Sequence, residues 1–218
     1  MSLVYFPSCK FRAAFPPAAQ KAEDYLRARF GACISGCCRS CRELLEEGDT
    51  AVCVCGTCRA ICAESSRAGE VLTVWELLDR DESFPFPEHS GEAVTLQDCW
   101  RARSQPGVHR AVRSLLRKMG YAVAEAPASR GKSLFCGVSL LSPPSGENAA
   151  LAPRCLGGDA QGAFRPCPPG EQRDAMARYC RSLPSERPVV AYCVSCVKGL
   201  RLGGADAIHL MELLTERL

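Results

Sequence analysis

Residues 50–58 read TAVCVCGTC, a β-like run that ends in the CxxC pair Cys55 and Cys58. Two cysteines three positions apart on a tight turn can aim both sulfurs at one metal centre, although zinc, iron–sulfur clusters and redox-active dithiols all use this spacing. Residues 188–196, PVVAYCVSC, repeat the arrangement. The second copy indicates that the chain contains an internal duplication.

The duplication extends upstream of both strands. In each half a short apolar segment ends in a cysteine, Cys9 or Cys99, and a proline follows seven positions later, Pro16 or Pro106. Each proline opens a pattern of apolar residues at helical spacing that runs up to a glycine, a natural helix cap. Both units are therefore predicted to begin with a strand, a cysteine and a helix.

A second cysteine site follows each predicted helix. GCCRSC contains the adjacent pair Cys37 and Cys38, whereas LFCGVS contains Cys136 alone. After the CxxC pairs the two halves end alike, in VLTVWELLDR and AIHLMELLTE. The order of cysteine, helix, cysteine, strand, CxxC and final helix is shared.

This order predicts an α/β fold of two pseudo-symmetric repeated units, with short parallel sheets flanked by helices and metal sites in loops at the strand carboxyl ends. The first cysteine-rich unit is predicted to span residues 1–80 and the second residues 94–218. The linker at residues 81–93 is rich in acids, Pro and Gly. A Pro/Gly-rich excursion of the second unit covers about residues 138–170.

The composition indicates how the cysteines are used. A chain of 218 residues with 47% hydrophobic residues can bury a core without disulfides, so its 16 cysteines need not be structural staples. The first residues show no signal-peptide pattern and no segment is long and apolar enough to span a bilayer, so a cytoplasmic location without a membrane span is predicted. In a reducing compartment, dense cysteines at short spacings are typical of metal or redox ligands.

The formal net charge of +3 counts every thiol as neutral. Because metal-bound cysteines are thiolates, the basic surplus does not indicate a nucleic-acid partner. Basic residues that flank cysteines would either compensate thiolate charge or form ordinary surface. They are Lys10, Arg12, Arg39, Arg42, Arg59, Arg101 and Lys198.

The two halves supply different numbers of candidate ligands. These are Cys9, Cys37, Cys38, Cys55 and Cys58 in the first half and Cys99, Cys136, Cys193 and Cys196 in the second. Four thiols suit tetrahedral zinc and an ordinary four-cysteine cluster equally well, whereas five exceed what tetrahedral zinc can use. Adjacent side chains also tend to point in different directions, so a centre with several irons fits the first set better.

This ordered set, with DCW opening the second unit and FCG in its middle, resembles the cysteine-rich CCG-domain family over roughly residues 4–80 and 94–215. The family includes the catalytic subunit of heterodisulfide reductase and iron–sulfur subunits of glycolate and lactate oxidases and of some succinate dehydrogenases. The resemblance implies an iron–sulfur redox protein, an electron-transfer or disulfide-reducing subunit of a larger oxidoreductase complex. Its implied partners are a flavoprotein or a ferredoxin-like protein, with a disulfide as substrate.

By the same resemblance, the five cysteines of the first half would hold a 4Fe–4S cluster of the noncubane type. The four of the second half would hold a second iron–sulfur cluster or zinc. Three features depart from the family pattern. Arg39 stands where the family prefers Gly, and the interval from Cys38 to Cys55 is short. Phe135 stands where the second unit would have the first cysteine of its pair. The two centres are therefore predicted to differ.

Two other classes remain open. A zinc-bearing scaffold or interaction protein would keep the fold without redox activity, and a thiol-based sensor would cycle Cys55 and Cys58 without metal. Four other cysteines are interpreted as small buried hydrophobic residues, although Cys53 shares strand parity with Cys55 and is an alternative ligand. They are Cys33, Cys41, Cys53 and Cys62. The last three, Cys155, Cys167 and Cys180, are interpreted as idle thiols, with a third metal site as the alternative.

Overall fold

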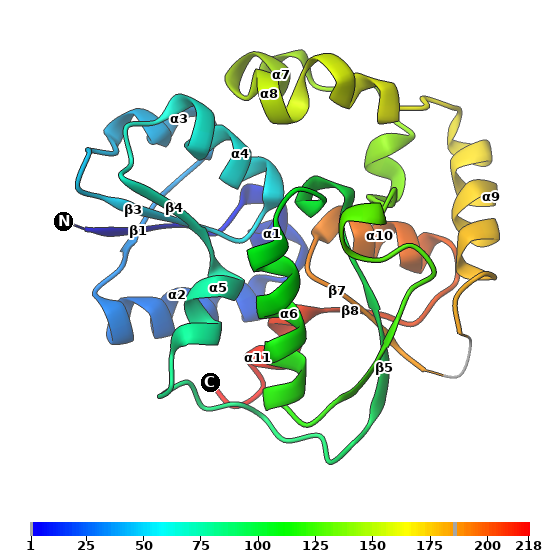
Figure 1. Ribbon diagram of the computed structural model, residues 1–218, viewed down its shortest axis with the longest axis horizontal. Coiled ribbons are helices and arrows are strands. Elements are labelled where there is room, and N and C mark those ends of the chain that lie inside the picture. The colour runs from blue at the N-terminus through cyan, green and yellow to red at the C-terminus, as the bar shows by residue number, and fades with distance from the viewer. Residues whose placement is uncertain (1, 185–186) are drawn as a thin grey trace.

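Two four-stranded sheets organise the chain in the computed structural model, which describes residues 2–184 and 187–218 (Figure 1). The first sheet is built from β1 (Leu3–Phe6), β2 (Cys33–Ile34), β3 (Thr50–Cys53) and β4 (Glu70–Thr73), and the second from β5 (Ala93–Gln97), β6 (Ala122–Glu125), β7 (Val189–Ala191) and β8 (Ala207–His209). Their orders, β2-β1-β3-β4 and β6-β5-β7-β8, are the same, and every pairing is parallel. The predicted α/β fold of two repeated units is confirmed.

Helices connect and cover the strands. In the first unit they are α1 (Cys9–Ala14), α2 (Pro16–Phe30), α3 (Cys38–Cys41), α4 (Gly56–Ser65), α5 (Val74–Arg80) and the 3₁₀ turn η1 (Arg42–Leu44). In the second they are α6 (Pro106–Lys118), α7 (Gly146–Leu151), α8 (Pro153–Leu156), α9 (Pro169–Cys180), α10 (Val194–Leu202), α11 (Leu210–Leu214) and the 3₁₀ turns η2 (Trp100–Ala102), η3 (Arg130–Lys132), η4 (Gly137–Leu140) and η5 (Gly158–Ala163).

Proline and glycine residues determine where the two long helices, α2 and α6, begin and end. Helices α2 and α6 begin at Pro16 and Pro106, where the missing N–H is one that the helix would leave unpaired. Gly31 ends α2 in the left-handed conformation (φ 63°), and Gly120 follows α6 with φ 82°. Both positions favour glycine because it has no Cβ to clash. The helices predicted after the two prolines are therefore present.

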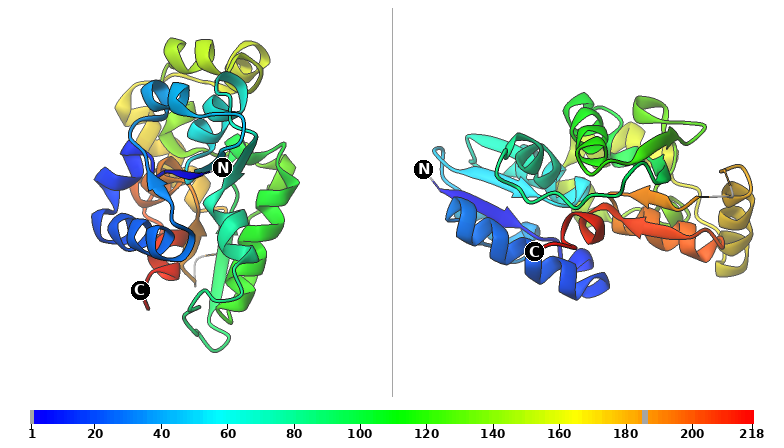
Figure 2. Two further views of the ribbon diagram at one scale, coloured as in Figure 1. Left: turned by 90° about the vertical axis from the view of Figure 1, so that its left-hand side faces the viewer. Right: turned by 90° about the horizontal axis from the view of Figure 1, so that it is seen from below.

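The two units pack through reciprocal contacts. Helix α5, which ends the first unit, packs on α6 of the second, and α11, which ends the second unit, packs on α2 of the first. A second pair of contacts also joins the units: α1 of the first unit contacts α10 of the second, and η2 of the second unit contacts α4 of the first. Figure 2 shows α2, α10 and α11 on one side of the sheets and α4, α5 and α6 on the other. Because each contact occurs twice with the two units interchanged, the units are related by a pseudo-twofold axis.

One apolar core spans the interface between the units. It includes Leu26 and Trp75 from the first unit and Leu115 and Leu214 from the second, all almost completely buried. The buried ring of His209 lies 4.8 Å from the ring of Phe11, a contact between the units. Separating the units would expose this core, so each unit depends on the other for burial of its apolar face.

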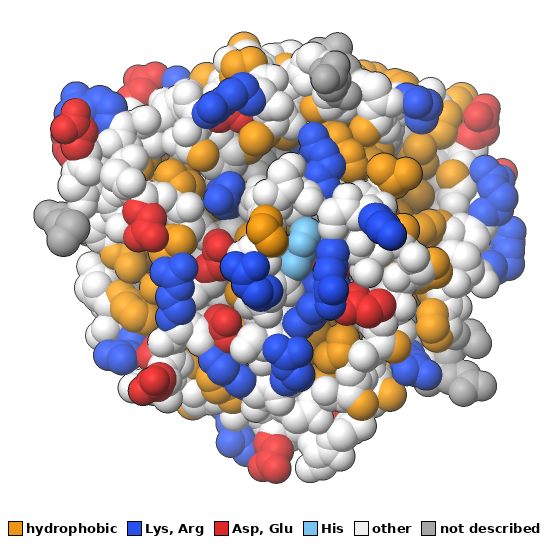
Figure 3. Space-filling view, viewed as in Figure 1, with side chains coloured by type: hydrophobic (Ala, Val, Ile, Leu, Met, Phe, Trp, Pro, Cys, Tyr) orange, Lys and Arg blue, Asp and Glu red, His pale blue; other side chains and the backbone are white. Residues whose placement is uncertain are grey.

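The exposed face of α6 is basic. Arg110, Arg117 and Lys118 point outward, whereas the opposite side of the helix is buried. In the space-filling view, Lys and Arg side chains gather over the middle of the face on which α6 lies (Figure 3). This pattern is the ordinary division of an amphipathic helix.

The segment from η4 to α9 forms an arm without a counterpart in the first unit. Its helices α7 and α8 pack on α4 of the first unit, at the top of Figure 1. There the Glu64 carboxylate accepts the backbone N–H groups of Arg154 and Cys155, at 2.8 and 2.9 Å. We define the arm as residues 137–168, which overlap the excursion predicted at about residues 138–170. The arm ties the second unit to the first.

Candidate metal centre

The candidate cysteines gather at the carboxyl ends of the strands. Cys9 and Cys55 follow the neighbouring strands β1 and β3, and Cys99 and Cys193 follow the neighbouring strands β5 and β7. Because parallel strands end at the same edge of a sheet, the loops of each pair meet there. Both sets of cysteines therefore lie where the fold prediction put them, at one edge of each sheet.

The four cysteines of the second unit form a group suited to binding a metal ion. The sulfurs of Cys99, Cys136, Cys193 and Cys196 all lie within 4.8 Å of one another, and those of Cys99 and Cys136 are 3.6 Å apart. A zinc ion about 2.3 Å from each of four sulfurs would hold them about 3.8 Å apart at the corners of a tetrahedron. Sulfurs bound to separate irons of a cluster lie farther apart, because each projects outward from its own iron. The spacing fits four ligands around one ion.

The charge state of this group also suits a metal. Hydrogen bonds from Cys193, Cys196 and Cys99 hold the pKa of Cys136 well below its usual range. Burial raises the pKa of Cys196 well above its usual range. The thiols therefore share negative charge among themselves, and a bound cation would displace the remaining protons.

A buried carboxylate holds the first ligand of this group in place. Asp98, which directly precedes Cys99, accepts two hydrogen bonds from the Arg113 guanidinium, 2.6 Å to Oδ2 and 3.3 Å to Oδ1. It also accepts the backbone N–H of Arg130 at 2.6 Å. Burial would raise the pKa of Asp98, but the hydrogen bonds and charge of Arg113 outweigh burial and lower it. Asp98 therefore stays ionised within the second unit.

Tyr192 connects two ligand loops through the same carboxylate. Its hydroxyl donates to Oδ1 of Asp98 at 2.9 Å and accepts the backbone N–H of Cys99 at 3.1 Å. Tyr192 itself directly precedes Cys193. In metal sites, partners outside the ligand set orient the ligands and raise affinity. Asp98 and Tyr192 were not singled out from the sequence; the available clue was a carboxylate placed directly before a candidate ligand.

Gly137 allows the Cys136 loop to approach α10. It has φ 53°, and a Cβ at this position would lie 1.9 Å from the carbonyl oxygen of Ser195 and 3.2 Å from the Cα of Gly199. Glycine is therefore required both by the backbone conformation and by the space. The sequence clue is that this glycine directly follows the ligand.

The five candidate ligands of the first unit line one cavity of about 190 Å³, which we call the cysteine cavity. Cys9 begins α1, Cys38 begins α3, and Cys58 lies in the first turn of α4, while Cys37 and Cys55 are the residues just before α3 and α4. Helix N-termini favour thiolates because their N–H groups and dipole attract negative charge. The fold brings these five sulfurs to one open space.

The backbone conformation explains how the adjacent residues Cys37 and Cys38 can both line the cysteine cavity. Cys37 is extended (φ −73°, ψ 129°), and the helix of α3 starts at Cys38, so the chain changes direction between them. Both side chains line the cysteine cavity as a result. The expected divergence of neighbouring side chains applies to a continuous strand and is avoided here by the helix start.

The thiols of the first set also interact with one another. A hydrogen bond from Cys58 lowers the pKa of Cys55 to about 5, and interactions with Cys38 and then Cys55 raise the pKa of Cys58 well above its usual range. Cys9 interacts with Cys37. Within the described chain, however, these sulfurs do not form a compact single-ion group like that of the second unit. The five cysteines of the first set therefore line a cavity and do not converge on the position of a single ion.

Arg101 lies between the two sets. Its charge interacts with Cys136 and Cys99 of the second set and with Cys55 of the first. Its guanidinium donates to the hydroxyl of Ser139 at 3.3 Å. Arg101 also lines the cysteine cavity together with Cys193, so the two sets are neighbours across this residue.

The remaining cysteines lie outside both sets. Cys53 and Cys62 are buried in an apolar cluster with sulfurs 3.9 Å apart, and neither lines the cysteine cavity. Cys33 is exposed at the start of the short strand β2, so its interpretation as a buried hydrophobic residue is wrong. Cys155 is also exposed, and the thiol of Cys180 donates to the carbonyl of Leu200. The burial of Cys53 and Cys62 agrees with their interpretation as small buried hydrophobic residues.

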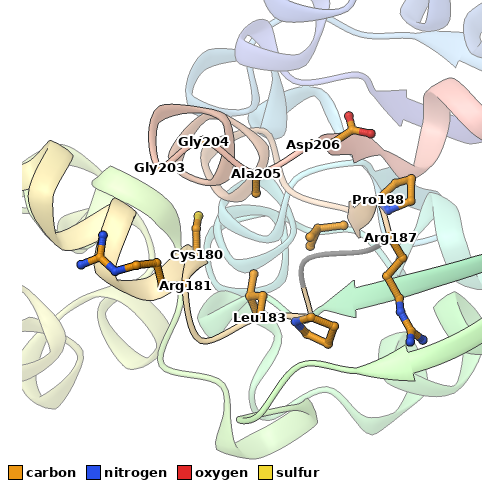
Figure 4. A pocket seen from close by; sticks show the side chains of 11 residues that line it. Cys180, Arg181, Leu183, Arg187, Pro188, Gly203, Gly204, Ala205 and Asp206 are labelled. Carbon is orange, nitrogen blue, oxygen red and sulfur yellow. The ribbon is translucent and has the colours of Figure 1, made fainter.

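A larger hollow of about 480 Å³ lies at the opposite edge of the second sheet (Figure 4). It adjoins Val189, the first residue of β7, and Asp206, the residue before β8. The side chains of Arg181 and Arg187 point away from one another at its two sides (Figure 4). The hollow lies at the amino ends of the strands and contains none of the predicted ligands.

No protein-family model, no characterised protein and no solved structure matches this chain. None of the helices within residues 2–184 and 187–218 has the length and apolar character that a bilayer-spanning helix needs. The class that fold and site define is a two-unit α/β protein with a four-cysteine group suited to a metal ion.

Proposed function

We propose that this chain is an iron–sulfur redox protein in which the two units hold different centres. The first unit would bind a 4Fe–4S cluster, and the second would bind a zinc ion. The observation that carries the proposal is the contrast between five sulfurs around a cavity and four sulfurs within 4.8 Å of one another. The resemblance of the cysteine order to the CCG-domain family supports the same assignment.

The residues of the first unit fit a cluster. Cys9, Cys37, Cys38, Cys55 and Cys58 would hold it, with a space of about 190 Å³ between them. The walls of that space also carry basic residues, which suit a centre made negative by thiolates and sulfide. When bound, the cluster would accept and donate single electrons. The protein supplies the ligands, the surrounding positive charge and access for a small molecule.

A disulfide is the proposed substrate. Cys9 is exposed, so the cysteine cavity can be reached from solvent on that side. The five-cysteine set resembles the motifs that hold disulfide-reducing clusters in the heterodisulfide reductase branch of the CCG-domain family, and this resemblance supports a disulfide as substrate. Electrons would come from a flavoprotein or a ferredoxin-like subunit of a larger complex. The free thiols suit a reducing compartment such as the cytoplasm.

A second candidate function is a zinc-bearing scaffold or interaction protein. The compact group of Cys99, Cys136, Cys193 and Cys196 favours it, because structural zinc needs no more than these four thiols. In that case the five cysteines of the first unit would remain free thiols. The two proposals make opposite predictions for iron.

Metal analysis of protein purified without oxygen separates them. We expect about four irons with acid-labile sulfide per chain and about one zinc. Colourless protein that contains zinc but no sulfide would exclude the redox proposal in favour of the scaffold. Protein with neither metal and a reversible Cys55–Cys58 disulfide would indicate a thiol-based sensor.

Single substitutions then assign the ligands. Cys37→Ala and Cys38→Ala should each alter the absorption spectrum and lower the iron content, whereas Cys136→Ala should remove zinc and spare iron. Cys33→Ala is the matched control, because Cys33 is exposed and does not line the cysteine cavity. Unchanged spectra in both Cys37→Ala and Cys38→Ala would rule out the five-ligand assignment.

A further inference from the structure

A second cavity of about 320 Å³ adjoins the cysteine cavity, and we call it the outer cavity. The two share part of their walls: Lys10, Arg101, Ser139, Asn148 and Ser195 line both. The shared residues make the outer cavity the natural approach to the sulfurs of the first unit. A ligand that reaches those sulfurs from this side must fit both spaces.

The arm of residues 137–168 forms much of the outer cavity. It contributes apolar side chains, among them Val138, Leu156 and Phe164, beside polar ones such as Ser142 and Ser145. The first unit has no equivalent segment, so the outer cavity is not a product of the duplication.

Contacts with the first unit hold the arm in position. Arg39, a residue of the cysteine cavity, pairs with Glu147 at 2.5 Å and donates to Oδ1 of Asn148 at 3.0 Å. Glu64 accepts two backbone N–H groups at the start of α8. The arm is thus fixed at both α7 and α8, and the cavity wall that it forms is a defined surface.

The charge of the outer cavity is positive. Lys10, Arg101 and Lys198 line it, and the described residues of its wall and of the cysteine cavity include no Asp or Glu. In the part of the chain that the structure covers, neither Lys10 nor Lys198 forms an ion pair with a carboxylate. The wall also carries the hydroxyl groups of Ser139 and Ser142. Lysine, arginine and hydroxyl groups are the partners that a carboxylate uses.

Charge compensation of the cysteines does not account for this arrangement. Lys198 lines the outer cavity but not the cysteine cavity, so it faces the approach rather than the sulfurs. It lies on the exposed side of α10, five residues after Cys193. The positive charge of Lys198 would therefore attract an anionic ligand that enters the outer cavity.

We propose that the outer cavity is an anion-binding site that selects small thiols or disulfides carrying a carboxylate. Lys10 and Lys198 bind the carboxylate, the apolar side chains of the arm contact the carbon chain, and the sulfur end reaches the cysteine cavity. The proposal deepens the function proposed above and rests on it for the identity of the sulfur ligand. Selection for an anion itself depends only on the residues of the outer cavity.

The test uses two pairs of probes that differ in charge. Adipate has the length of dithiodiglycolate but no disulfide, and 1,6-hexanediol is its uncharged counterpart. We expect calorimetry on the full chain, purified without oxygen, to show saturable binding of adipate that weakens with added salt, and no comparable binding of hexanediol. Lys10→Gln and Lys198→Gln should each weaken adipate binding about tenfold.

Lys132→Gln is the matched control, because Lys132 is an exposed lysine of η3 that lines neither cavity. It should leave adipate binding unchanged, and the three variants should keep the melting temperature of the unmodified protein. Equal binding of adipate and hexanediol would overturn the proposal. So would adipate binding that survives in the double variant Lys10→Gln/Lys198→Gln.

The second pair of probes connects binding to turnover. If the protein reduces disulfides, the KM for dithiodiglycolate should rise about tenfold in Lys10→Gln, while that for the uncharged 2-hydroxyethyl disulfide stays the same. A rise for both would contradict charge selection. Because adipate cannot be reduced, failure of disulfide reduction would count against the redox function and leave the anion site to be decided by the calorimetry.

Discussion

The Arg113 guanidinium holds the Asp98 carboxylate through two hydrogen bonds, of 2.6 and 3.3 Å, in the interior of the second unit. The Asp98 side chain is 0% exposed and that of Arg113 is 7% exposed. Removing one member of such a buried pair leaves a charge without water or a partner, which is far more costly than losing a surface pair. Since Asp98 directly precedes Cys99, the pair also fixes the chain at the first ligand.

Asp98→Ala should therefore lower the free energy of unfolding by about 3 kcal/mol, measured by urea denaturation. Arg113 would keep its contact with Glu125, at 2.5 Å, which limits the loss. Glu125→Ala is the matched control: its side chain is 37% exposed, so its removal should cost about 1 kcal/mol or less. Equal losses in the two variants would show that burial of Asp98 is not the decisive factor.

Gly137→Ala should destabilise the second unit by about 2 kcal/mol or more and weaken metal retention. The added Cβ would lie 1.9 Å from the carbonyl oxygen of Ser195, so the Cys136 loop must move away from α10. Unfolding by denaturant and zinc release to a chelator measure the two effects.

Gly170→Ala is the control for that substitution. Gly170 lies in the first turn of α9, and a Cβ there would have no neighbour within 4 Å. Its stability should change by less than about 0.5 kcal/mol. If Gly137→Ala behaves like Gly170→Ala, the close approach of the Cys136 loop to α10 is not required.

Much of the fold was predictable because its determinants are local and occur twice. Pro16 and Pro106 mark the starts of α2 and α6, and the apolar runs before Cys55 and Cys193 form the central strands β3 and β7. A local pattern that recurs in the same order leaves few arrangements of strands and helices. The position of the cysteines at the carboxyl ends of parallel strands follows from it, whereas the order of the strands was not predicted.

The parts that escaped prediction depend on contacts between distant residues. Arg113 meets Asp98 only after α6 packs against β6 and η2, and Glu64 meets Arg154 only after the arm crosses to the first unit. Neither contact leaves a regular spacing in the sequence. The same holds for the difference between the two centres: Phe135 in place of a cysteine indicated a difference, but the spacing of the four sulfurs is a property of the folded loops.

Asp81 predicts a pH dependence of stability away from both cysteine sets. Its buried carboxylate accepts hydrogen bonds from the hydroxyl of Tyr25, at 2.6 Å, and from Arg29, at 3.2 Å. Burial would raise the pKa of Asp81, but these hydrogen bonds and the charge of Arg29 outweigh it and lower the pKa below its ordinary value. The folded state therefore holds the carboxylate ionised more strongly than the unfolded chain does.

A lowered folded-state pKa contributes stability that is fully present above the unfolded value of about 3.9 and is lost as the pH falls through the folded value. Asp81→Asn should therefore cost about 2 kcal/mol at pH 7, and the difference should vanish toward pH 2. Urea denaturation across this range measures it. Asp24→Asn, at an exposed pair with Arg27, should show almost no such dependence, and a constant deficit in Asp81→Asn would contradict the assignment.

Tyr192→Phe tests whether the hydroxyl between Asp98 and Cys99 supports the metal ligands. The substitution removes one oxygen and keeps the ring, so packing should be preserved while the backbone N–H of Cys99 loses its partner. Zinc affinity, measured by competition with a chromogenic chelator, should fall by about 10- to 100-fold. Tyr179→Phe is the control, because the Tyr179 hydroxyl donates to Gln97 instead. Equal affinity in both variants would remove Tyr192 from the support of the site.

The last prediction asks whether Cys53 or Cys62 is a metal ligand. Their sulfurs lie 3.9 Å apart, in an apolar cluster that also includes Cys38 and Cys58 of the first set. Cys53 stands two positions before Cys55 and Cys62 seven positions after it; the same positions relative to Cys193 are Ala191 and Leu200, which cannot bind metal. The second unit thus shows that the fold needs only small or apolar groups here. Both cysteines belong to an apolar cluster that includes Phe6 and Leu45.

We expect the double variant Cys53→Ala/Cys62→Ala to lose about 2 kcal/mol of stability, since two buried sulfurs are removed and small cavities remain. Its iron content and absorption spectrum should match those of the unmodified protein, whereas Cys58→Ala, from the same helix as Cys62, should lose iron. Thermal unfolding and metal analysis measure the two outcomes separately. Loss of iron in the double variant would show that Cys53 or Cys62 is a ligand. The five cysteines that line the cysteine cavity would then not be the complete ligand set of the first centre.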